Sequence, residues 1–239
     1  MHDGPKLPAA AEIRSYGRRH GRKFSPRQAA LLRDELPKIS LDLTAPAPRP
    51  LGLLFDRAVA DVWLEIGFGG GEHLVWQAEH NPNVGLVGCE PFLDGVVKML
   101  SSIEQHGLRN VRIHAHDARD VLRWLPDASL ARVFILFPDP WPKKRHRKRR
   151  LVSHDLLSGL ARVVKTGGEL RMATDIGDYA RTALSCVRQA SEFEWLAKGP
   201  GDWRQRPADW PPTRYEEKAL TGGRLCYFLS FRRRPRPAG

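Results

Sequence analysis

Short, mainly apolar runs alternate with longer amphipathic stretches along most of the chain. Runs such as 84–89 and 131–137, apolar at nearly every position, are typical of strands buried on both faces of a parallel sheet. The stretches between them place apolar residues three and four positions apart, as on one face of a helix. The pattern predicts strands at 61–66, 84–89, 111–114, 131–137, 169–173, 193–196 and 224–231, and helices at 26–36, 71–80, 92–106, 118–125, 151–165 and 177–190.

This alternation predicts an α/β fold built on a mostly parallel, seven-stranded sheet, with an antiparallel hairpin at its C-terminal end. We expect the globular domain to occupy residues 56–239. Residues 1–55 are basic and rich in proline, so we expect a partly disordered arm and a Pro-rich connector over 41–50. Within the arm, Ser25 and Pro26 have the residue types of an N-cap and a first helical position.

The sequence is strongly basic, with 39 Lys and Arg against 27 Asp and Glu and a formal net charge of +12. Such an excess predicts an anionic partner, nucleic acid first and an anionic membrane surface second; a basic protein without such a partner is the alternative. Part of this charge lies in the arm, where we expect either contacts with RNA phosphates or a solvated, flexible tail. The arm residues concerned are Arg14, Arg18, Arg19, Arg22 and Lys23.

Cysteine usage bears on the compartment. Cys89, Cys186 and Cys226 are far apart and fit neither a disulfide framework nor a metal-ligand spacing. We therefore expect a reducing, cytoplasmic setting and no bound metal. The first residues lack the apolar run of a signal peptide, and no apolar stretch has the length of a membrane span, so we expect no membrane partner.

Glycines at alternate positions follow the first predicted strand. Gly67, Gly69 and Gly71 permit a sharp turn into a helix and a close approach of a ligand to the backbone. A dinucleotide-binding loop would have Gly or Ala where Glu72 stands, and carboxylates at 65 and 72 suit a cation better than a pyrophosphate. The pattern E-x-G-x-G-x-G resembles motif I of the Rossmann-like S-adenosylmethionine (SAM) methyltransferases. A glycine-rich turn without a ligand is the alternative.

Acidic residues stand at the ends of the next two strands. Glu90 follows strand 84–89, a position where a carboxylate accepts hydrogen bonds from vicinal ribose hydroxyls. Asp117 follows strand 111–114 and has the right chemistry to accept from an adenine amine, to cap the next helix, or to do both. Adjacent parallel strands bring such tips together at one edge of the sheet.

A proline-rich loop follows the fourth predicted strand and places Asp139, Trp141 and Lys143 among three prolines. Proline fixes φ and lacks an N–H, so we expect a stiff loop that presents a site for a flat base; a hydrophobic plug is the alternative. The dense basic run that follows favours contact with substrate RNA, although a solvated face or a nuclear-targeting signal has the same composition. This run comprises Lys144, Arg145, His146, Arg147, Lys148, Arg149 and Arg150.

Over nearly its whole length the chain resembles the bacterial tRNA (guanine-N7-)-methyltransferases of the TrmB type. The motifs that carry the resemblance are RSYGRR, LEIGFGGG, GCEP, HDA, FPDPWPKKRHRKRR, ATD and TRYE. It implies a Rossmann-like, class I SAM-dependent methyltransferase fold. It also implies methyl transfer from SAM to N7 of guanine in the variable loop of tRNA, with S-adenosyl-L-homocysteine as product and a monomer or homodimer as the active species.

Carried over residue by residue, the resemblance implies three groups of contacts. The implied SAM contacts are Glu65, Gly67, Gly69, Gly71, Glu90, Asp117 and Asp139, with Asp139 also catalytic. The implied substrate contacts are Lys143, Asp175, Thr213, Arg214, Tyr215 and Glu216. The implied RNA contacts are Arg145, His146, Arg147, Lys148, Arg149 and Arg150. Pro142 and Ile176 depart from the family pattern, and the second departure bears on base packing near Asp175.

The chemistry of guanine agrees with these residue types. Its N7 carries a lone pair and no proton, so the reaction needs alignment rather than a general base. Its N1–H and N2 amine are donors, for which Asp139, Asp175 and Glu216 carry matching acceptors, while Trp141 is expected either to stack on the base or to pack. Two other functions stay open: an amino-group nucleic-acid methyltransferase, whose loop would read [DN]-P-P-[FYW], and a non-catalytic RNA-binding protein on the same fold.

Overall fold

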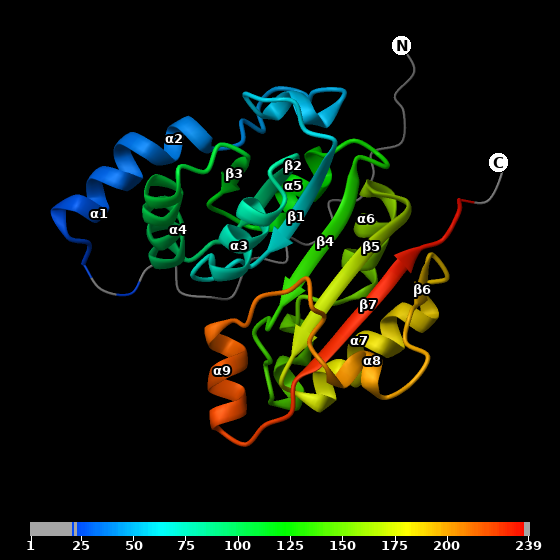
Figure 1. Cartoon of the computed structure of the whole chain (residues 1–239). Helices are drawn as coiled ribbons and strands as arrows, with labels where there is room; N and C mark the ends of the chain where they lie inside the picture. Colours follow the sequence, from blue (N-terminus) through cyan, green and yellow to red (C-terminus); the bar gives the residue numbers. More distant parts are fainter. Residues whose placement is uncertain (1–20, 22, 237–239) are drawn as a thin grey trace, which may run out of the picture.

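The computed structural model describes residue 21 and residues 23–236. Within them, seven strands form one sheet in the order β3-β2-β1-β4-β5-β7-β6 (Figure 1). Pairing is parallel from β3 to β5, and β7 runs antiparallel to both β5 and β6. The strands are β1 (Asp61–Ile66), β2 (Val84–Cys89), β3 (Val111–His114), β4 (Leu130–Leu136), β5 (Val164–Thr174), β6 (Phe193–Trp195) and β7 (Tyr227–Arg233). The predicted fold class is confirmed.

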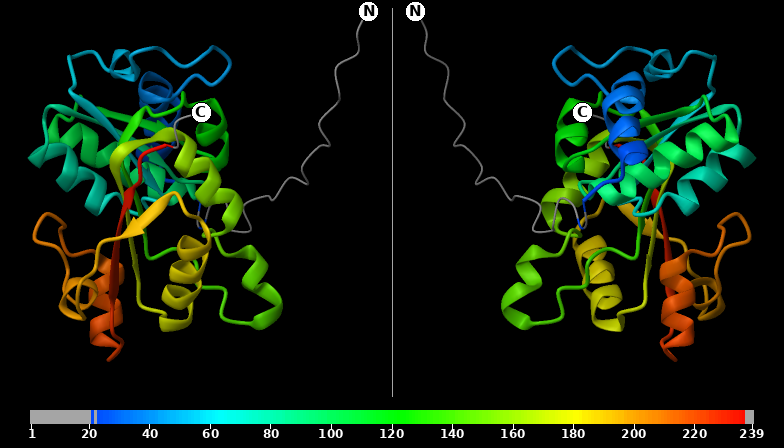
Figure 2. Two further views of the ribbon diagram at one scale, coloured as in Figure 1. Left: turned by 90° about the vertical axis from the view of Figure 1, so that its right-hand side faces the viewer. Right: turned by 90° about the vertical axis from the view of Figure 1, so that its left-hand side faces the viewer.

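Helices cover both faces of this sheet. The longer ones are α3 (Glu72–His80), α4 (Leu93–His106), α5 (Ala118–Trp124), α6 (His154–Val163) and α7 (Gly177–Gln189). Helices α3 and α4 pack on one face, and α5, α6 and α7 pack on the other (Figure 2). The shorter elements are α1 (Pro26–Ala30), the π-helical turn η1 (Leu31–Glu35), α2 (Leu36–Ile39), the 3₁₀ turns η2 (Leu51–Leu54) and η3 (Lys144–Arg149), α8 (Gly201–Arg204) and α9 (Arg214–Thr221).

The central strands alternate between two buried cores. In β1, Leu64 and Ile66 pack with α5, α6 and α7, while Trp63 packs with α3 and α4. Successive side chains of a strand point to opposite faces, so burial of both faces accounts for the nearly continuous apolar runs. By the same alternation, Glu65 lies on the side of Trp63, which determines its partner below.

The N-terminal part of the described chain packs onto this domain. The predicted helix 26–36 forms, but it continues through η1 and α2 to Ile39. Leu31 packs in the core on the α3 and α4 side, and Leu41 and Phe55 pack in the core on the opposite side. The division at residue 55 stays a prediction, and the predicted phosphate contacts at positions 14, 18, 19 and 22 lie outside the described residues.

The predicted elements differ from the observed ones mainly at their ends and in the C-terminal third. Helix α6 ends at Val163 and β5 begins at once with Val164, so the last two residues of the predicted helix 151–165 belong to β5. Helix α9 was not predicted. It begins after Thr213, whose side-chain oxygen accepts a hydrogen bond from the Glu216 N–H at 3.3 Å and caps the helix.

Candidate active site

The glycine loop joins β1 to α3. Gly67, Gly69 and Gly71 have φ values of 77°, 56° and 88°, a region that strains residues with a Cβ. The Gly67 N–H donates to the Cys89 carbonyl at 2.8 Å, which ties the loop to the end of β2. A Cβ on Gly67 would meet nothing within 4 Å, so this glycine borders open space. Gly71 instead packs against Met99 of α4, where a Cβ would lie 2.5 Å from the sulfur.

Glu90 stands at the tip of β2 and is held by two backbone donors. Its Oε2 accepts from the Gly69 N–H at 2.8 Å, and its Oε1 accepts from the Phe92 N–H at 2.9 Å. Burial raises the pKa of this carboxyl, and the two N–H donors oppose that rise. Each carboxylate oxygen accepts more than one hydrogen bond, so both retain capacity for ligand hydroxyls.

A cavity of about 400 Å³ lies at this edge of the sheet. Of the predicted SAM contacts, it brings together Gly67, Gly69, Glu90, Asp117 and Asp139. It is also lined by residues that no sequence motif marked as site residues, namely Cys89, Phe92, Arg119, Leu136, Phe137 and Leu151. A strand end or helix start at these positions is visible in the sequence, but the direction of each side chain is not.

Asp117 is the N-cap of α5, and it also lines the cavity. Its Oδ1 accepts from the Arg119 N–H at 2.9 Å, and its Oδ2 lies 2.7 Å from Nη1 of the same arginine. The capping interpretation is therefore confirmed. Arg119 also lines the cavity, and its positive charge offsets the negative charge of Asp117.

The loop after β4 has a backbone that few residues adopt without strain. Phe137 and Trp141 have φ values of 48° and 41°, in the left-handed region that favours glycine. They bracket Asp139, which is exposed and lines the cavity together with Trp141. At the start of the loop, the Phe137 N–H donates to the Ala173 carbonyl at 2.7 Å. Such strain persists only where the surrounding structure holds it.

Glu65 does not line the cavity. It is 2% exposed and faces α3, where its Oε2 lies 2.7 Å from Nδ1 of His73. His73 Nε2 lies 3.1 Å from the Gln77 side-chain nitrogen. One assignment satisfies both contacts: the His73 Nδ1–H donates to Glu65, and Nε2 accepts from Gln77. The structure therefore gives Glu65 a contact with α3, and its contact with SAM stays a prediction.

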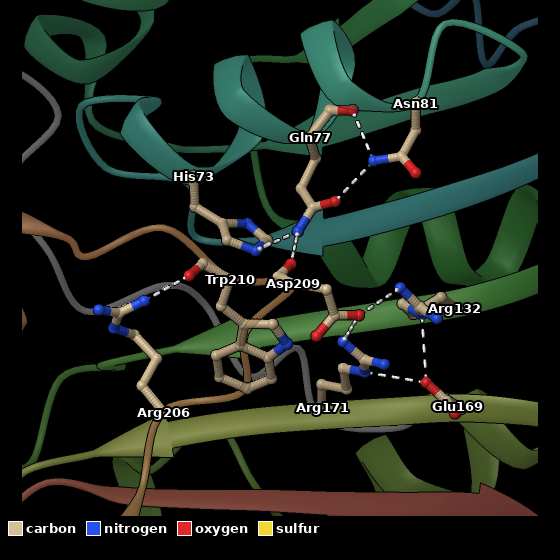
Figure 3. Close-up of polar contacts among 9 residues, drawn as sticks. All are labelled: His73, Gln77, Asn81, Arg132, Glu169, Arg171, Arg206, Asp209 and Trp210. Carbon is tan, nitrogen blue, oxygen red and sulfur yellow. Dashed lines mark hydrogen bonds and ion pairs between the residues drawn. The ribbon is translucent and has the colours of Figure 1, made fainter.

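Side chains of α3 and of the sheet bind Asp209, in the segment that precedes α9 (Figure 3). The Gln77 side chain donates to the Asp209 carbonyl at 2.9 Å. The Asp209 carboxylate lies 2.6 Å from Nη1 of Arg171 and 3.5 Å from Nη1 of Arg132. Trp210, 2% exposed, fills the core beside these groups. No sequence motif marks Asp209 or Trp210 as a partner of residues more than thirty positions away.

The four residues of the TRYE segment differ in their positions relative to the cavity. Thr213 caps α9, and Glu216 is 7% exposed and accepts from Arg206 Nε at 3.0 Å. Arg214 and Tyr215 both line the cavity. Arg214 also lies 3.3 Å from Glu72 at the start of α3. The structure thus brings two of these four predicted substrate contacts to the cavity.

The remaining predicted substrate contacts lie outside the cavity wall. Asp175, at the tip of β5, lies 2.7 Å from Nε of Arg224 in the turn before β7. Lys143 is exposed and precedes η3, and its carbonyl accepts from the His146 N–H at 2.8 Å.

The basic run forms η3, and its members have different environments. Lys144, Arg145, Arg147 and Lys148 are exposed. Burial, and after it the positive charges of neighbouring residues, lowers the pKa of His146. The Arg149 guanidinium lies 5.0 Å from the Trp141 ring centroid and lines the cavity. Arg150 is buried and points inward. Burial therefore separates the exposed cations of the run from Arg150, which lies in the interior. The sequence of the run, a series of like charges, does not show this difference.

The sequence was compared with known proteins. It matches the family described as "Putative methyltransferase" over residues 59–229. It is 49% identical to the tRNA (guanine-N(7)-)-methyltransferase of Ruegeria sp. (strain TM1040), over 97% of this chain and 94% of that protein. Proteins of the same name from Rhodospirillum rubrum and Brucella melitensis biotype 1 are 50% and 46% identical, over 98% and 95% of this chain and 92% and 97% of theirs. The chain belongs to the tRNA (guanine-N(7)-)-methyltransferase family.

Solved structures agree on the fold. The 16S rRNA methyltransferase KamB has a TM-score of 0.56 and 17% identity, over 74% of this chain and 89% of that one. The precorrin-6y C5,15-methyltransferase from Geobacter metallireducens GS-15 has a TM-score of 0.50 and 15% identity, over 75% and 84%. At such identities the similarity concerns the fold alone, and the Rossmann-like methyltransferase fold is confirmed.

As a family member, this protein is a SAM-dependent methyltransferase, and its cavity fits that ligand. Gly67 leaves space beside the backbone, and Glu90 offers acceptors for ribose hydroxyls. Glu90 and Asp139 place negative charge where a sulfonium and an ammonium are to be held. No trio of His, Cys, Asp or Glu side chains within the described part of the chain forms a metal site. No helix in that part has the length and apolar character of a membrane span.

We expect the SAM affinity of this methyltransferase to fall as the pH is lowered through the raised pKa of Glu90. The ionised carboxylate accepts from ribose hydroxyls, and protonation removes acceptor capacity, so SAM favours the ionised form. A raised pKa places this loss at a higher pH than an ordinary glutamate would. Glu90→Gln should weaken binding by about tenfold or more at neutral pH.

Calorimetric titrations from about pH 8 to about pH 5 would test this, with Glu194→Gln on exposed β6 as the matched control. The pH dependence should be present in the control and absent in Glu90→Gln. Equal pH dependence in both variants would move ribose recognition away from Glu90.

A second prediction concerns Gly95, where α4 approaches the glycine loop. A Cβ there would lie 2.1 Å from the Gly69 carbonyl oxygen, so Gly95→Ala must displace backbone. We expect a loss of about 1–3 kcal/mol in unfolding free energy. We also expect SAM to bind about tenfold more weakly or worse, because the displaced loop is the one that Glu90 holds.

The matched control is Gly159→Ala in α6, where a Cβ would make an ordinary contact of 3.9 Å with Leu122. Thermal denaturation and SAM titration of both variants would measure the two effects. Normal SAM affinity in Gly95→Ala would show that the loop tolerates the shift.

Proposed function

We propose that this protein transfers a methyl group from SAM to N7 of guanine in the variable loop of tRNA. The observation that carries the proposal is that the stiff, strained loop after β4 brings Asp139 and Trp141 to the same cavity as Glu90. The relatives named above, which match nearly the whole chain, support the choice of tRNA and of guanine N7.

Different residues of the cavity would contact different parts of SAM and of the acceptor base. When bound, SAM supplies a methyl group activated by the sulfonium. Glu90 would hold the ribose hydroxyls, the glycine loop would lie along the ligand, and Asp117 would accept from the adenine amine. Asp139 would contact both the ligand and the acceptor base, because it is exposed at the cavity wall beside Trp141.

The acceptor requires alignment and charge stabilisation rather than proton removal. Guanine N7 has no proton to lose, and the methylated purine is cationic. A carboxylate such as Asp139 stabilises positive charge that develops on the base, and an indole such as Trp141 offers a stacking surface. Arg214 and Tyr215 at the cavity wall are placed to contact the nucleotide that enters.

The exposed cations of η3, together with the lysine directly before it, would bind the phosphates of the tRNA backbone. These are Lys143, Lys144, Arg145, Arg147 and Lys148. Each phosphate that they neutralise contributes about 0.7–0.9 to the salt slope of binding. A cytoplasmic location agrees with this substrate and with the three free cysteines, Cys89, Cys186 and Cys226.

The product of the reaction tests the proposal against its main alternative. Purified protein, labelled SAM and unmodified tRNA transcript should yield 7-methylguanosine, because N7 is the nucleophile that needs no base. A transcript with adenine in place of the variable-loop guanine should yield none. A methylated exocyclic amine would instead favour an amino-group methyltransferase, and binding of both ligands without product would favour a non-catalytic RNA-binding protein.

A further prediction concerns the catalytic role of Asp139. Asp139→Asn keeps the shape of the side chain and removes its charge, so kcat should fall by about 10²-fold while SAM and tRNA still bind. Single-turnover rates with both ligands saturating would measure this, with Glu194→Gln as the surface control. A rate near that of the wild-type protein would remove Asp139 from the catalytic role.

A further inference from the structure

Arg150 differs from the rest of the basic run in its surroundings. Its side chain is 2% exposed, whereas that of Arg147 is 47% exposed. It follows η3 directly, and its side chain reaches α7. Its backbone N–H donates to the Arg147 carbonyl at 3.0 Å and closes the last turn of η3.

All three guanidinium nitrogens of Arg150 have protein acceptors. Nη2 donates to Asp178 Oδ2 at 2.7 Å, and Nη1 donates to Thr182 Oγ1 at 2.8 Å. Both partners lie on α7, and the guanidinium lies 5.0 Å from the ring centroid of Tyr179 on the same helix. The hydrogen bond from Arg150 is the largest cause of the lowered pKa of Asp178. Helix α7 thus holds the guanidinium in one orientation.

The third nitrogen reaches the loop that carries Asp139. Nε of Arg150 donates to the Pro140 carbonyl at 3.0 Å, one residue beyond Asp139. This loop has positive φ at Phe137 and Trp141, so its conformation must be held by external contacts. The prolines of this loop supply no N–H donors, so their carbonyl oxygens are the only backbone hydrogen-bonding groups that they offer to a neighbour.

We propose that Arg150 is a positioning residue that holds Asp139 in place through the Pro140 carbonyl, and not a phosphate-binding residue. The proposal rests on the function proposed above. To reach a phosphate, the guanidinium would have to break its hydrogen bonds to Asp178, Thr182 and Pro140. A misplaced group at a reacting centre lowers the rate steeply: an error of about 1 Å costs on the order of 10²-fold.

The test compares Arg150→Met, Arg150→Lys and Lys148→Ala, a change at an exposed cation of the same run. Met keeps the length and loses every donor, so the single-turnover rate at saturating SAM and tRNA should fall by about 10²-fold. Lys keeps one donor group and should restore part of the rate. The salt slope of tRNA binding should stay as in the wild-type protein for Arg150→Met and shrink by about 0.7–0.9 for Lys148→Ala.

Hydrogen exchange supplies a readout that needs no activity. The peptide that spans 137–141 should exchange faster in Arg150→Met and at the wild-type rate in Lys148→Ala. If Arg150→Met unfolds, Asp178→Asn provides the second variant, because it weakens the hold of α7 on Arg150 at a partly exposed position. It should show the same faster exchange to a smaller degree.

The outcomes separate the two proposals. A reduced salt slope with unchanged exchange in Arg150→Met would make Arg150 a phosphate contact and overturn the inference. Wild-type protein that forms no 7-methylguanosine would overturn the proposed function, while the exchange data would still decide whether Arg150 holds the loop.

Discussion

The hydrogen bond from the Gly69 N–H to the Glu90 carboxylate is the contact on which the site depends. It joins the loop after β1 to the tip of β2, and it requires the left-handed backbone that Gly69 adopts at φ 56°. Burial of Glu90 is costly, as its raised pKa shows, and the two N–H donors offset part of that cost. A carboxylate fixed in this way is already oriented for a ligand before one arrives.

The acidic side chains in and around the cavity differ in whether an arginine pairs with them. Arg119 neutralises Asp117, and Arg214 of the cavity wall pairs with Glu72, which does not line the cavity. Within the described part of the chain, neither Glu90 nor Asp139 forms an ion pair with a cation, so their negative charge is available to a cationic ligand. The large positive excess of the chain is carried elsewhere, partly by the exposed face of η3, where it meets solvent and phosphate rather than SAM.

Sequence reasoning succeeded where the signal is local. Alternating apolar runs determined the order and type of the strands, and glycines that need positive φ, together with Glu90 at a strand tip, located the cavity. It did not reveal that Glu65 turns to His73, that Arg150 turns to α7, or that Glu216 is buried under Arg206. Each of these depends on a partner distant in sequence or on a helix boundary, and a motif shared with a family records the residue type without recording its direction.

The contacts of Glu65 show how a residue outside the cavity can still matter to it. Glu65 fixes His73, His73 fixes Gln77, and Gln77 holds the carbonyl of Asp209. The Asp209 carboxylate is in turn bound by Arg171 of β5, so the segment leading to α9 is held at two points. Helix α3 therefore supports the glycine loop at its N-terminus and, one turn later, the segment that delivers Arg214 and Tyr215. Because one rigid helix carries both attachments, the SAM side and the substrate side of the cavity keep a fixed separation, which is the geometric requirement of a reaction that depends on alignment.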